Sequence, residues 1–241
     1  MKNHSRIAIV AALEREVHPL IRRWRACWRE HDGWRFRFFE KDDVVLVCGG
    51  MGAEAARRAT EALIALYAPK QVYSVGFAGA LDPALQVGTV LRPERVVNGS
   101  DGSSVSVAGG DGVLVSFDGI ASPEQKAKLR DAFAAQAVDM EAAAVARAAE
   151  ARGVGFAAVK VISDDSEFRF PPLERFVDGA GRFLEARFVL FAAVRPWLWP
   201  RVIRLARNSR RASRALCDWL QNVVLTPPAV VGKDAEVVHH P

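Results

Sequence analysis

Three acidic residues stand at the ends of apolar segments, where carboxylates can do chemistry. Glu16 follows the apolar run 6–12, Asp164 follows the run 155–162, and Glu141 opens an alanine-rich helical segment. Carboxyl groups in such places act as general acids and bases or stabilise developing positive charge. Each also has a structural explanation, because acids favour helix N-termini and turns. Taken one at a time, the spacing favours the structural explanation.

Two glycine-rich segments accompany these acids. Gly49-Gly50-Met51-Gly52 directly precedes a strong helical pattern at 53–68. Gly76-Phe77-Ala78-Gly79-Ala80 follows an apolar strand at 71–75 and is expected to form a loop. Glycine permits close approach of the backbone to a ligand, so both segments are candidate binding turns.

Apolar strands alternate with helical segments along the chain. We expect strands at 6–12, 34–39, 44–47, 71–75, 87–97 and 155–162, and helices beginning at Glu14 and over 53–68, 123–135, 141–151 and 202–220. This alternation predicts an α/β sandwich with a mainly parallel or mixed sheet. Ligands of such sheets bind where strand ends meet loops, here after Ala12, Val75 and Ile162.

The composition of the 241 residues is that of a globular protein, with 50% hydrophobic and 25% charged residues. It excludes disordered, collagen-like and disulfide-stapled classes. The three cysteines are far apart and lack CxxC spacing, and the five histidines lack metal-ligand spacing, so we expect no metal site. The N-terminus lacks a signal-peptide layout and no 18-residue uncharged apolar stretch occurs, which predicts a cytoplasmic protein.

The basic character of the chain, whose net charge is +5, is concentrated near its end. Seven arginines and no acid lie in one span: residues 195, 201, 204, 207, 210, 211 and 214. The neighbouring segment 188–203 is apolar and aromatic. A C-terminal helix packed on the domain with solvated arginines is the favoured interpretation; a peripheral membrane contact at the inner face is the second. Nucleic-acid binding is not expected, because no recognisable module accompanies the charge.

Five segments occur in the order of one known family. They are IAIVAALEREV (7–17), GGMGAEAA (49–56), SVGFAGALDPALQVGTVL (74–91), AVDMEAAAVA (137–146) and VKVISD (159–164). The chain thereby resembles the nucleoside phosphorylase and nucleosidase superfamily, of the methylthioadenosine/S-adenosylhomocysteine nucleosidase type. Residues 163–171 and 199–216 resemble more narrowly the hopanoid-associated nucleoside phosphorylases.

The resemblance implies a three-layer α/β/α sandwich with a mixed central sheet. It also implies a nucleoside phosphorylase-like catalytic domain over 1–185. We expect a basic amphipathic helical segment at 186–222 and a loose tail at 223–241. Active sites of this superfamily often borrow residues from a neighbouring subunit, so the resemblance further implies a homo-oligomer.

The resemblance also implies roles for the acids. Asp164 would protonate N7 of a purine as the N-glycosidic bond breaks, because a neutral base leaves more readily than an anion. Glu141 would hold the ribose hydroxyls, with Met140 packing against the sugar. Glu16 would orient and deprotonate the attacking water, with Glu14 as the alternative. Further substrate contacts are implied for Gly50, Gly52, Gly76, Phe77, Ala78, Gly79, Ile120, Ala121 and Ser163.

One departure from the family bears on the reaction. Phe77 stands where family members commonly have a serine or threonine, and Ser74 stands where a bacterial phosphorylase would have a phosphate-binding arginine. An aromatic ring offers no hydrogen bonds to a phosphate dianion. We therefore expect hydrolysis of a 5′-modified adenine nucleoside without metal or organic cofactor. The alternatives are phosphate-dependent cleavage, for example of an adenosyl-hopanoid, and a catalytically silent membrane-associated nucleoside-binding protein.

Overall fold

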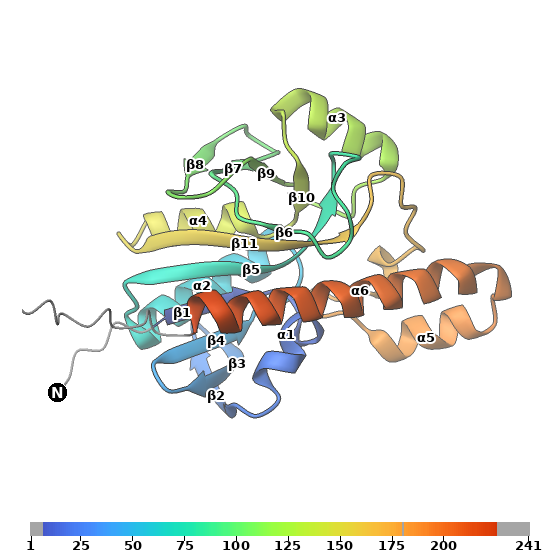
Figure 1. The fold of residues 1–241 in the computed structure, drawn as a ribbon. Helices are drawn as coiled ribbons and strands as arrows, with labels where there is room; N and C mark the ends of the chain where they lie inside the picture. The colour runs from blue at the N-terminus through green and yellow to red at the C-terminus, as the bar shows by residue number, and fades with distance from the viewer. Residues whose placement is uncertain (1–6, 180, 226–241) are drawn as a thin grey trace, which may run out of the picture.

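The computed structural model describes residues 7–179 and 181–225, which form one mixed sheet covered by helices (Figure 1). The strands are β1 (Ile7–Ala11), β2 (Arg25–His31), β3 (Trp34–Lys41), β4 (Val44–Cys48), β5 (Gln71–Ala80), β6 (Val90–Leu91), β7 (Arg95–Asn98), β8 (Ser104–Ser106), β9 (Val113–Ser116), β10 (Ala137–Asp139) and β11 (Gly155–Asp164). The helices are α1 (Glu14–Ile21), α2 (Ala53–Tyr67), α3 (Pro123–Phe133), α4 (Ala142–Glu150), α5 (Glu185–Ala193) and α6 (Trp199–Trp219). Short helical turns are η1 (Glu174–Phe176), η2 (Pro196–Leu198) and η3 (Leu220–Val224).

The centre of the sheet is parallel. Strand β5 pairs in parallel with β1 on one side and with β11 on the other, while β10 joins the end of β5 antiparallel. The carboxyl ends of β1, β5 and β11 consequently lie at one edge of the sheet. The order along the main path is β2-β3-β4-β1-β5-β10-β9-β7-β8, which confirms the predicted mixed sheet.

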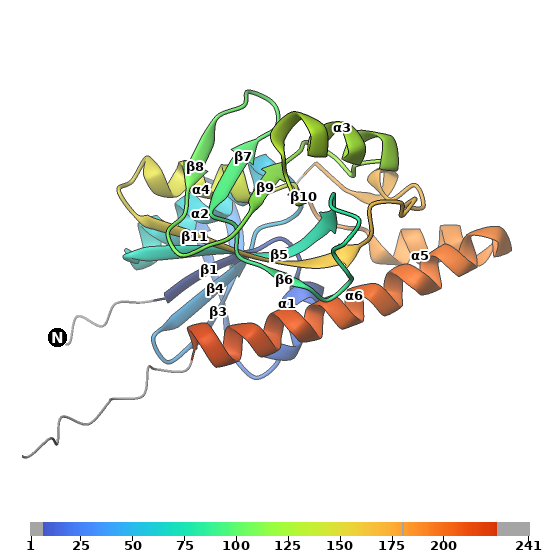
Figure 2. The same cartoon turned by 45° about the horizontal axis from the view of Figure 1, so that its top comes forward.

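Alternating side chains of β1 show why helices cover both faces. Ile9 packs in a cluster with Val17 of α1 and Leu216 of α6. Ala8 and Val10 point the other way, into a cluster formed with α2 and α4. Because both faces of the strand are apolar, both need a helical layer. The result is the predicted three-layer α/β/α sandwich, and Figure 2 shows α1 and α6 on one side of the sheet and α2 and α4 on the other.

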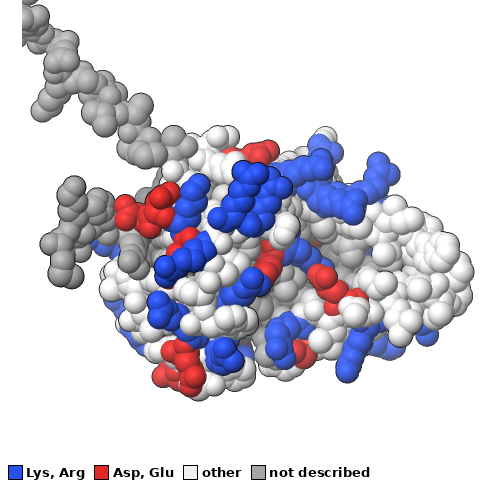
Figure 3. Space-filling model, turned by 90° about the horizontal axis from the view of Figure 1, so that it is seen from below, with Lys and Arg blue, Asp and Glu red and all other residues white. Residues whose placement is uncertain are grey.

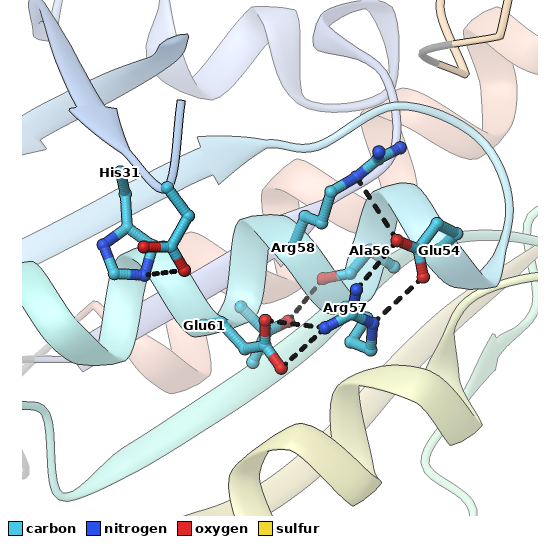
Figure 4. Close-up of polar contacts among 8 residues, drawn as sticks. His31, Glu54, Ala56, Arg57, Arg58 and Glu61 are labelled. Atoms are coloured by element: carbon cyan, nitrogen blue, oxygen red, sulfur yellow. Dashed lines mark hydrogen bonds and ion pairs between the residues drawn. The ribbon is translucent and has the colours of Figure 1, made fainter. Parts of the chain in front are cut away.

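Helix α2 is amphipathic, and its outer face carries ion pairs rather than apolar side chains. Arg57 binds both Glu54 and Glu61 at 2.8 Å, and Arg58 lies 3.8 Å from Glu54 (Figure 4). The guanidinium of Arg58 also lies 4.0 Å from the ring centre of Trp34. Exposed pairs of this kind add at most about 1 kcal/mol each, so the buried face of α2 is what holds the helix in place.

The segment 76–80 corrects one prediction. It was expected to be a loop, but β5 continues through it to Ala80. Strand β11 pairs with this part of β5 as far as Gly79, and β10 pairs with Gly79 and Ala80. Hydrogen bonds from β10 and β11 thus stabilise an extended conformation that the glycine-rich sequence alone does not favour.

Three strands have no counterpart among the predicted strands: β2, β8 and β9. Helix α5 lies at the start of the helical segment expected at 186–222. The arginine- and tryptophan-rich segment 22–39 contains β2, which is the edge strand of the sheet.

Helix α6 joins the basic C-terminal segment to the core. Its second half contributes Ala212, Leu216 and Cys217 to the cluster around β1 and α1. Its first half extends with α5 beyond the sheet (Figures 1 and 2). The boundaries expected after residues 185 and 222, between catalytic domain, helical segment and tail, remain a prediction. Most of the tail expected at 223–241 cannot be compared with the structure, because residues 226–241 lie outside the described residues. None of the helices in the described ranges combines the length and apolar character needed to cross a bilayer.

Candidate active site

The three predicted acids line one pocket at the carboxyl ends of the central strands. Glu16 enters from the start of α1, Glu141 from the junction of β10 and α4, and Asp164 from the last residue of β11. All three side chains are buried to less than 10% exposure. A mainly parallel sheet places its strand ends together, which is why residues nearly 150 positions apart meet here.

Glu16, rather than its neighbour Glu14, points into the pocket. Its carboxylate accepts a 3.3 Å hydrogen bond from the backbone N–H of Leu13, and burial raises its pKa while the charge of Lys160 lowers it. The side chain of Glu14 is 44% exposed and pairs with Arg37 on the surface at 3.0 Å. A difference of two positions on one helix therefore separates a buried carboxylate from a solvated one.

Glu141 is held by the glycine turn before α2. The backbone N–H of Gly52 donates to Glu141 Oε1 at 2.8 Å, and Gly52 has a φ of 91°, which favours glycine. Burial, and then the nearby Asp139 carboxylate, raise the pKa of Glu141 to about 7. Glu141 occupies the N-cap position of α4 but makes no side-chain capping bond. Its carboxylate is directed to the pocket and not to the helix end.

Asp164 lies at an irregularity in β11. The register with β5 shifts between Ile162 and Asp164, so the regular pairing of the two strands is interrupted next to the acid. Ser163 Oγ donates to Asp164 Oδ1 at 2.7 Å, and Lys126 Nζ donates to Asp164 Oδ2 at 2.5 Å. Burial raises the pKa of Asp164, while the Lys126 ammonium opposes that rise. The carboxyl is thus dry, oriented through both oxygens and able to hold a proton above its ordinary range.

Two glycines of β5 are required by the acids beside them. A Cβ at Gly76 would lie 2.9 Å from Glu16 Oε2, and one at Gly79 would lie 2.8 Å from Asp164 Oδ2. Both distances are shorter than ordinary contacts, so any side chain would displace a carboxylate. The strand that was expected to be a loop thus supports Glu16 and Asp164 through its missing side chains.

The remaining pocket wall is largely apolar. The predicted residues Phe77, Ala78, Gly79, Ile120, Ala121, Met140 and Ser163 all line it. Phe77 also packs against the core cluster of β1, so it serves both wall and core. Gly50, Gly52 and Gly76 do not line the pocket: Gly50 donates to the backbone of Ala12, and the other two lie behind Glu141 and Glu16. Phe170, Leu173 and Leu205 add an apolar side that the sequence analysis did not include.

Two buried lysines, Lys126 and Lys160, form ion pairs with acids in and beside the pocket. Besides its bond to Asp164, Lys126 Nζ donates to the backbone oxygen of Asp165 at 2.6 Å. Lys160 lies 2.8 Å from Asp139 Oδ2, and Asp139 also accepts from Ser116 and from the backbone N–H of Ala142. Burial acts to lower the pKa of Lys160, but the surrounding carboxylates outweigh it and raise the pKa.

Sequence reasoning missed both lysines, and for different reasons. Lys160 interrupts a strand that is otherwise apolar, and a charge in such a strand must find a partner, so a signal was present. Lys126 lies in PEQKAKLRD, which has the composition of a solvated helix and carries no such signal. In the described part of the chain, no cluster of three or more His, Cys, Asp and Glu could hold a metal ion.

Comparisons with known proteins identify the family of the chain. A family model described as the phosphorylase superfamily matches residues 6–111 and 105–182. The 5′-methylthioadenosine/S-adenosylhomocysteine nucleosidase of Marinomonas sp. (strain MWYL1) is 35% identical over 96 residues, which span 38% of this chain and 41% of that protein. The enzyme of the same name from Staphylococcus aureus (strain JH9) is 29% identical, and the match covers 66% of this chain and 86% of that protein.

Solved structures share the fold. A 5′-methylthioadenosine/S-adenosylhomocysteine nucleosidase from Neisseria meningitidis, in complex with methylthio-immucillin-A, superposes with a TM-score of 0.69 at 19% identity, covering 91% of this chain and 98% of that one. Futalosine hydrolase of Helicobacter pylori superposes with a TM-score of 0.58 at 20% identity, covering 66% and 88%. At these identities the similarity establishes the architecture of the sheet and its helices.

Proposed function

Because the chain belongs to the phosphorylase superfamily, a family of enzymes, we propose that it hydrolyses the N-glycosidic bond of a 5′-modified adenine nucleoside and releases the free base. The observation that carries this proposal is the meeting of Glu16, Glu141 and Asp164 in one buried pocket. Relatives named methylthioadenosine/S-adenosylhomocysteine nucleosidase support the hydrolytic form of the reaction.

Asp164 is the proposed general acid. Its proton passes to N7 of the purine as the bond between N9 and C1′ breaks, so that the base leaves neutral. The dry surroundings that raise the pKa of Asp164 keep a proton available. The hydrogen bond from Ser163 holds the carboxyl in a fixed orientation during the transfer.

Glu141 and Met140 are the proposed sugar contacts. As an ionised group, Glu141 accepts hydrogen bonds from the ribose hydroxyls and stabilises positive charge that develops on the sugar ring. Met140 lines the same side of the pocket and packs on the apolar face of the ribose.

Glu16 is the proposed base for the attacking water. The water oxygen bonds to C1′ while its proton passes to Glu16, and the hydroxyl formed at C1′ remains on the released sugar. One water is consumed for each base released. Return of one proton from Glu16 to Asp164 through solvent restores the starting state.

The charges in the pocket favour water over phosphate as the nucleophile. Glu16 and Glu141 repel a dianion, and the ring of Phe77 offers it no hydrogen bond. Lys126 is occupied by Asp164 and the backbone of Asp165. Ser74, at the position expected for a phosphate-binding arginine in phosphorylases, is buried inside β5.

The apolar side of the pocket favours an apolar 5′ substituent. Phe77, Phe170, Leu173 and Leu205 line it, the last of these from α6. A thioether, or the hydrocarbon of a hopanoid-linked adenosine, has the matching chemistry. These four apolar side chains offer no partner to a strongly charged 5′ group, which would lose its hydration against them.

Measuring adenine release from a panel of 5′-substituted adenosines, with and without phosphate, tests the proposal. Phosphate-independent release of adenine with a free sugar supports hydrolysis. A sugar 1-phosphate that forms only with phosphate present would establish the phosphorolytic alternative. No release from any substrate would favour the nucleoside-binding protein. The homo-oligomer implied by the resemblance stays a prediction, which sedimentation of the purified chain tests.

A further inference from the structure

The described surface exposes its large apolar side chains mainly in one place. Val189, Leu190, Val194, Trp197, Trp199 and Ile203 are each about half exposed or more. All six lie between residues 189 and 203, in α5, the turn that follows it, η2 and the first turns of α6. We refer to these six residues as the apolar tip. Contiguous exposed apolar surface of this kind marks an interaction site.

The apolar tip is a folded structure with a packed inner side. Phe188 and Ala192 of α5 and Leu198 of η2 are buried. Trp199 Nε1 donates to the backbone oxygen of Ala192 at 3.0 Å, and Arg195 donates to that of Phe191 at 2.8 Å. The exposed side chains are therefore presented by a fixed helical hairpin. That hairpin extends beyond the edge of the sheet in Figure 1.

Arginines surround the apolar tip. Arg187, Arg201 and Arg207 are exposed, and within the described residues none of them has a carboxylate within 4.0 Å. Arg204 is paired with Asp165. Figure 3 shows the projecting end of the molecule as a broad uncharged surface, with blue Lys and Arg side chains and a smaller red acidic group along its margins.

We propose that the apolar tip and its arginines dock the protein peripherally on an anionic lipid bilayer. Tryptophan side chains favour the membrane interface, since the ring is apolar and its N–H is polar. Each arginine near an anionic surface gains attraction from the lipid headgroups. A membrane-surface element needs an apolar face with basic residues beside it, and this hairpin has both.

The docking surface is connected to the pocket through one helix. Leu205 and Ser209 of α6 line the pocket, and they follow Trp199 by less than three helical turns. Docking therefore holds the apolar wall of the pocket near the headgroup layer. This part of the inference rests on the proposed function, whereas the docking itself does not.

Flotation of the full chain with vesicles tests the inference. We expect binding to phosphatidylcholine vesicles that contain phosphatidylglycerol, little binding to pure phosphatidylcholine, and loss of binding at high salt. The triple variant Leu190→Ser, Val194→Ser, Trp197→Ser is expected to bind at least ~100-fold more weakly. The double variant Arg201→Glu, Arg207→Glu is expected to bind at least ~30-fold more weakly.

Matched controls change the same residue types elsewhere. Trp28→Ser with Trp34→Ser removes two exposed tryptophans of β2 and β3, and Arg22→Glu with Arg23→Glu reverses two exposed charges near α1. Both controls are expected to bind like the unchanged protein. The assignment would be overturned if the test and control variants all lost vesicle binding equally. It would also be overturned if none of them lost it.

Two further outcomes would also overturn it. The first is absence of binding to the anionic vesicles. The second is a sedimenting oligomer that the triple serine variant dissociates, because a second copy of the chain would then cover the apolar tip. Hydrolysis of a water-soluble nucleoside by the same variants, in the absence of vesicles, separates this inference from the proposed reaction. That activity is expected to be unchanged.

Discussion

Lys126 Nζ and Asp164 Oδ2 are 2.5 Å apart, and both side chains are almost wholly buried. The pair joins α3 to the end of β11 and brings a fixed positive charge to the proposed general acid. Burial favours the protonated form of Asp164, while the ammonium favours the ionised form. The balance between the two decides the pH at which the acid loses its proton.

Replacing Lys126 by methionine is expected to shift the pH profile upward. Without the ammonium, burial raises the pKa of Asp164 further, so the protonated acid persists to higher pH. The alkaline limb of kcat/KM for adenine release should move to higher pH. Lys126→Arg keeps the charge and should leave the limb near its original position. An unshifted limb in Lys126→Met would show that Lys126 does not set this ionisation.

Asp164→Asn is expected to abolish catalysis with the fold intact. An amide has no proton to transfer to N7, and loss of a general acid lowers rates by roughly 10²–10⁴-fold. Asp165→Asn is the matched control, because Asp165 is adjacent in sequence but pairs with Arg204 and does not line the pocket. Turnover of Asp164→Asn close to that of Asp165→Asn would refute the assignment. Circular dichroism checks that both variants remain folded.

Glu16 and Glu14, both in α1, allow the proposed base to be compared with a nearby surface carboxylate. Glu16→Gln is expected to lower kcat by roughly 10²–10⁴-fold, since the water loses its base. Glu14→Gln changes a surface pair with Arg37 and is expected to keep wild-type kcat. A rate loss in Glu14→Gln with normal turnover in Glu16→Gln would reverse the assignment. Steady-state adenine release from both variants makes the comparison.

The strand pattern explains why much of the site was predictable. Apolar runs before Glu16 and Asp164 identify buried strands, and parallel strands bring their ends together, so both acids were expected at one edge. The distinction between Glu14 and Glu16 came from the resemblance, because both fit the start of a helix. The structure separates them through burial.

Long-range partners explain what was not predictable. The segment 76–80 forms a strand because β10 and β11 pair with it, and neither partner is local in sequence. Lys126 contacts an acid 38 positions away, while its own helix has an ordinary surface composition. A helical segment was expected at 186–222, but the separate bounds of α5 could not be read from its continuous apolar sequence. Several of its apolar side chains are exposed, against the usual rule that such residues are buried. Functional surfaces break sequence rules in this way.

Glu141 predicts a specific pH dependence of stability. Its pKa in the folded protein is about 7, above the ordinary 4.5, so the folded state retains a proton that the unfolded state has lost between these values. The stability from this group is therefore complete below about pH 4.5 and is lost as pH rises through about 7. At 1.36 kcal/mol per pKa unit, the loss approaches roughly 3 kcal/mol.

Glu141→Gln removes this dependence, because the amide is neutral at every pH and its oxygen can still accept from the N–H of Gly52. Urea unfolding near pH 5 and near pH 8 measures the effect. The variant should gain stability relative to wild type at the higher pH, whereas the exposed Glu14→Gln should follow wild type at both. Parallel losses in Glu141→Gln and wild type would mean that another group titrates. If the pH dependence disappears in Glu141→Gln, Glu141 is the group that titrates. The carboxylate proposed to bind ribose in its ionised form is then one whose protonated form is favoured by folding.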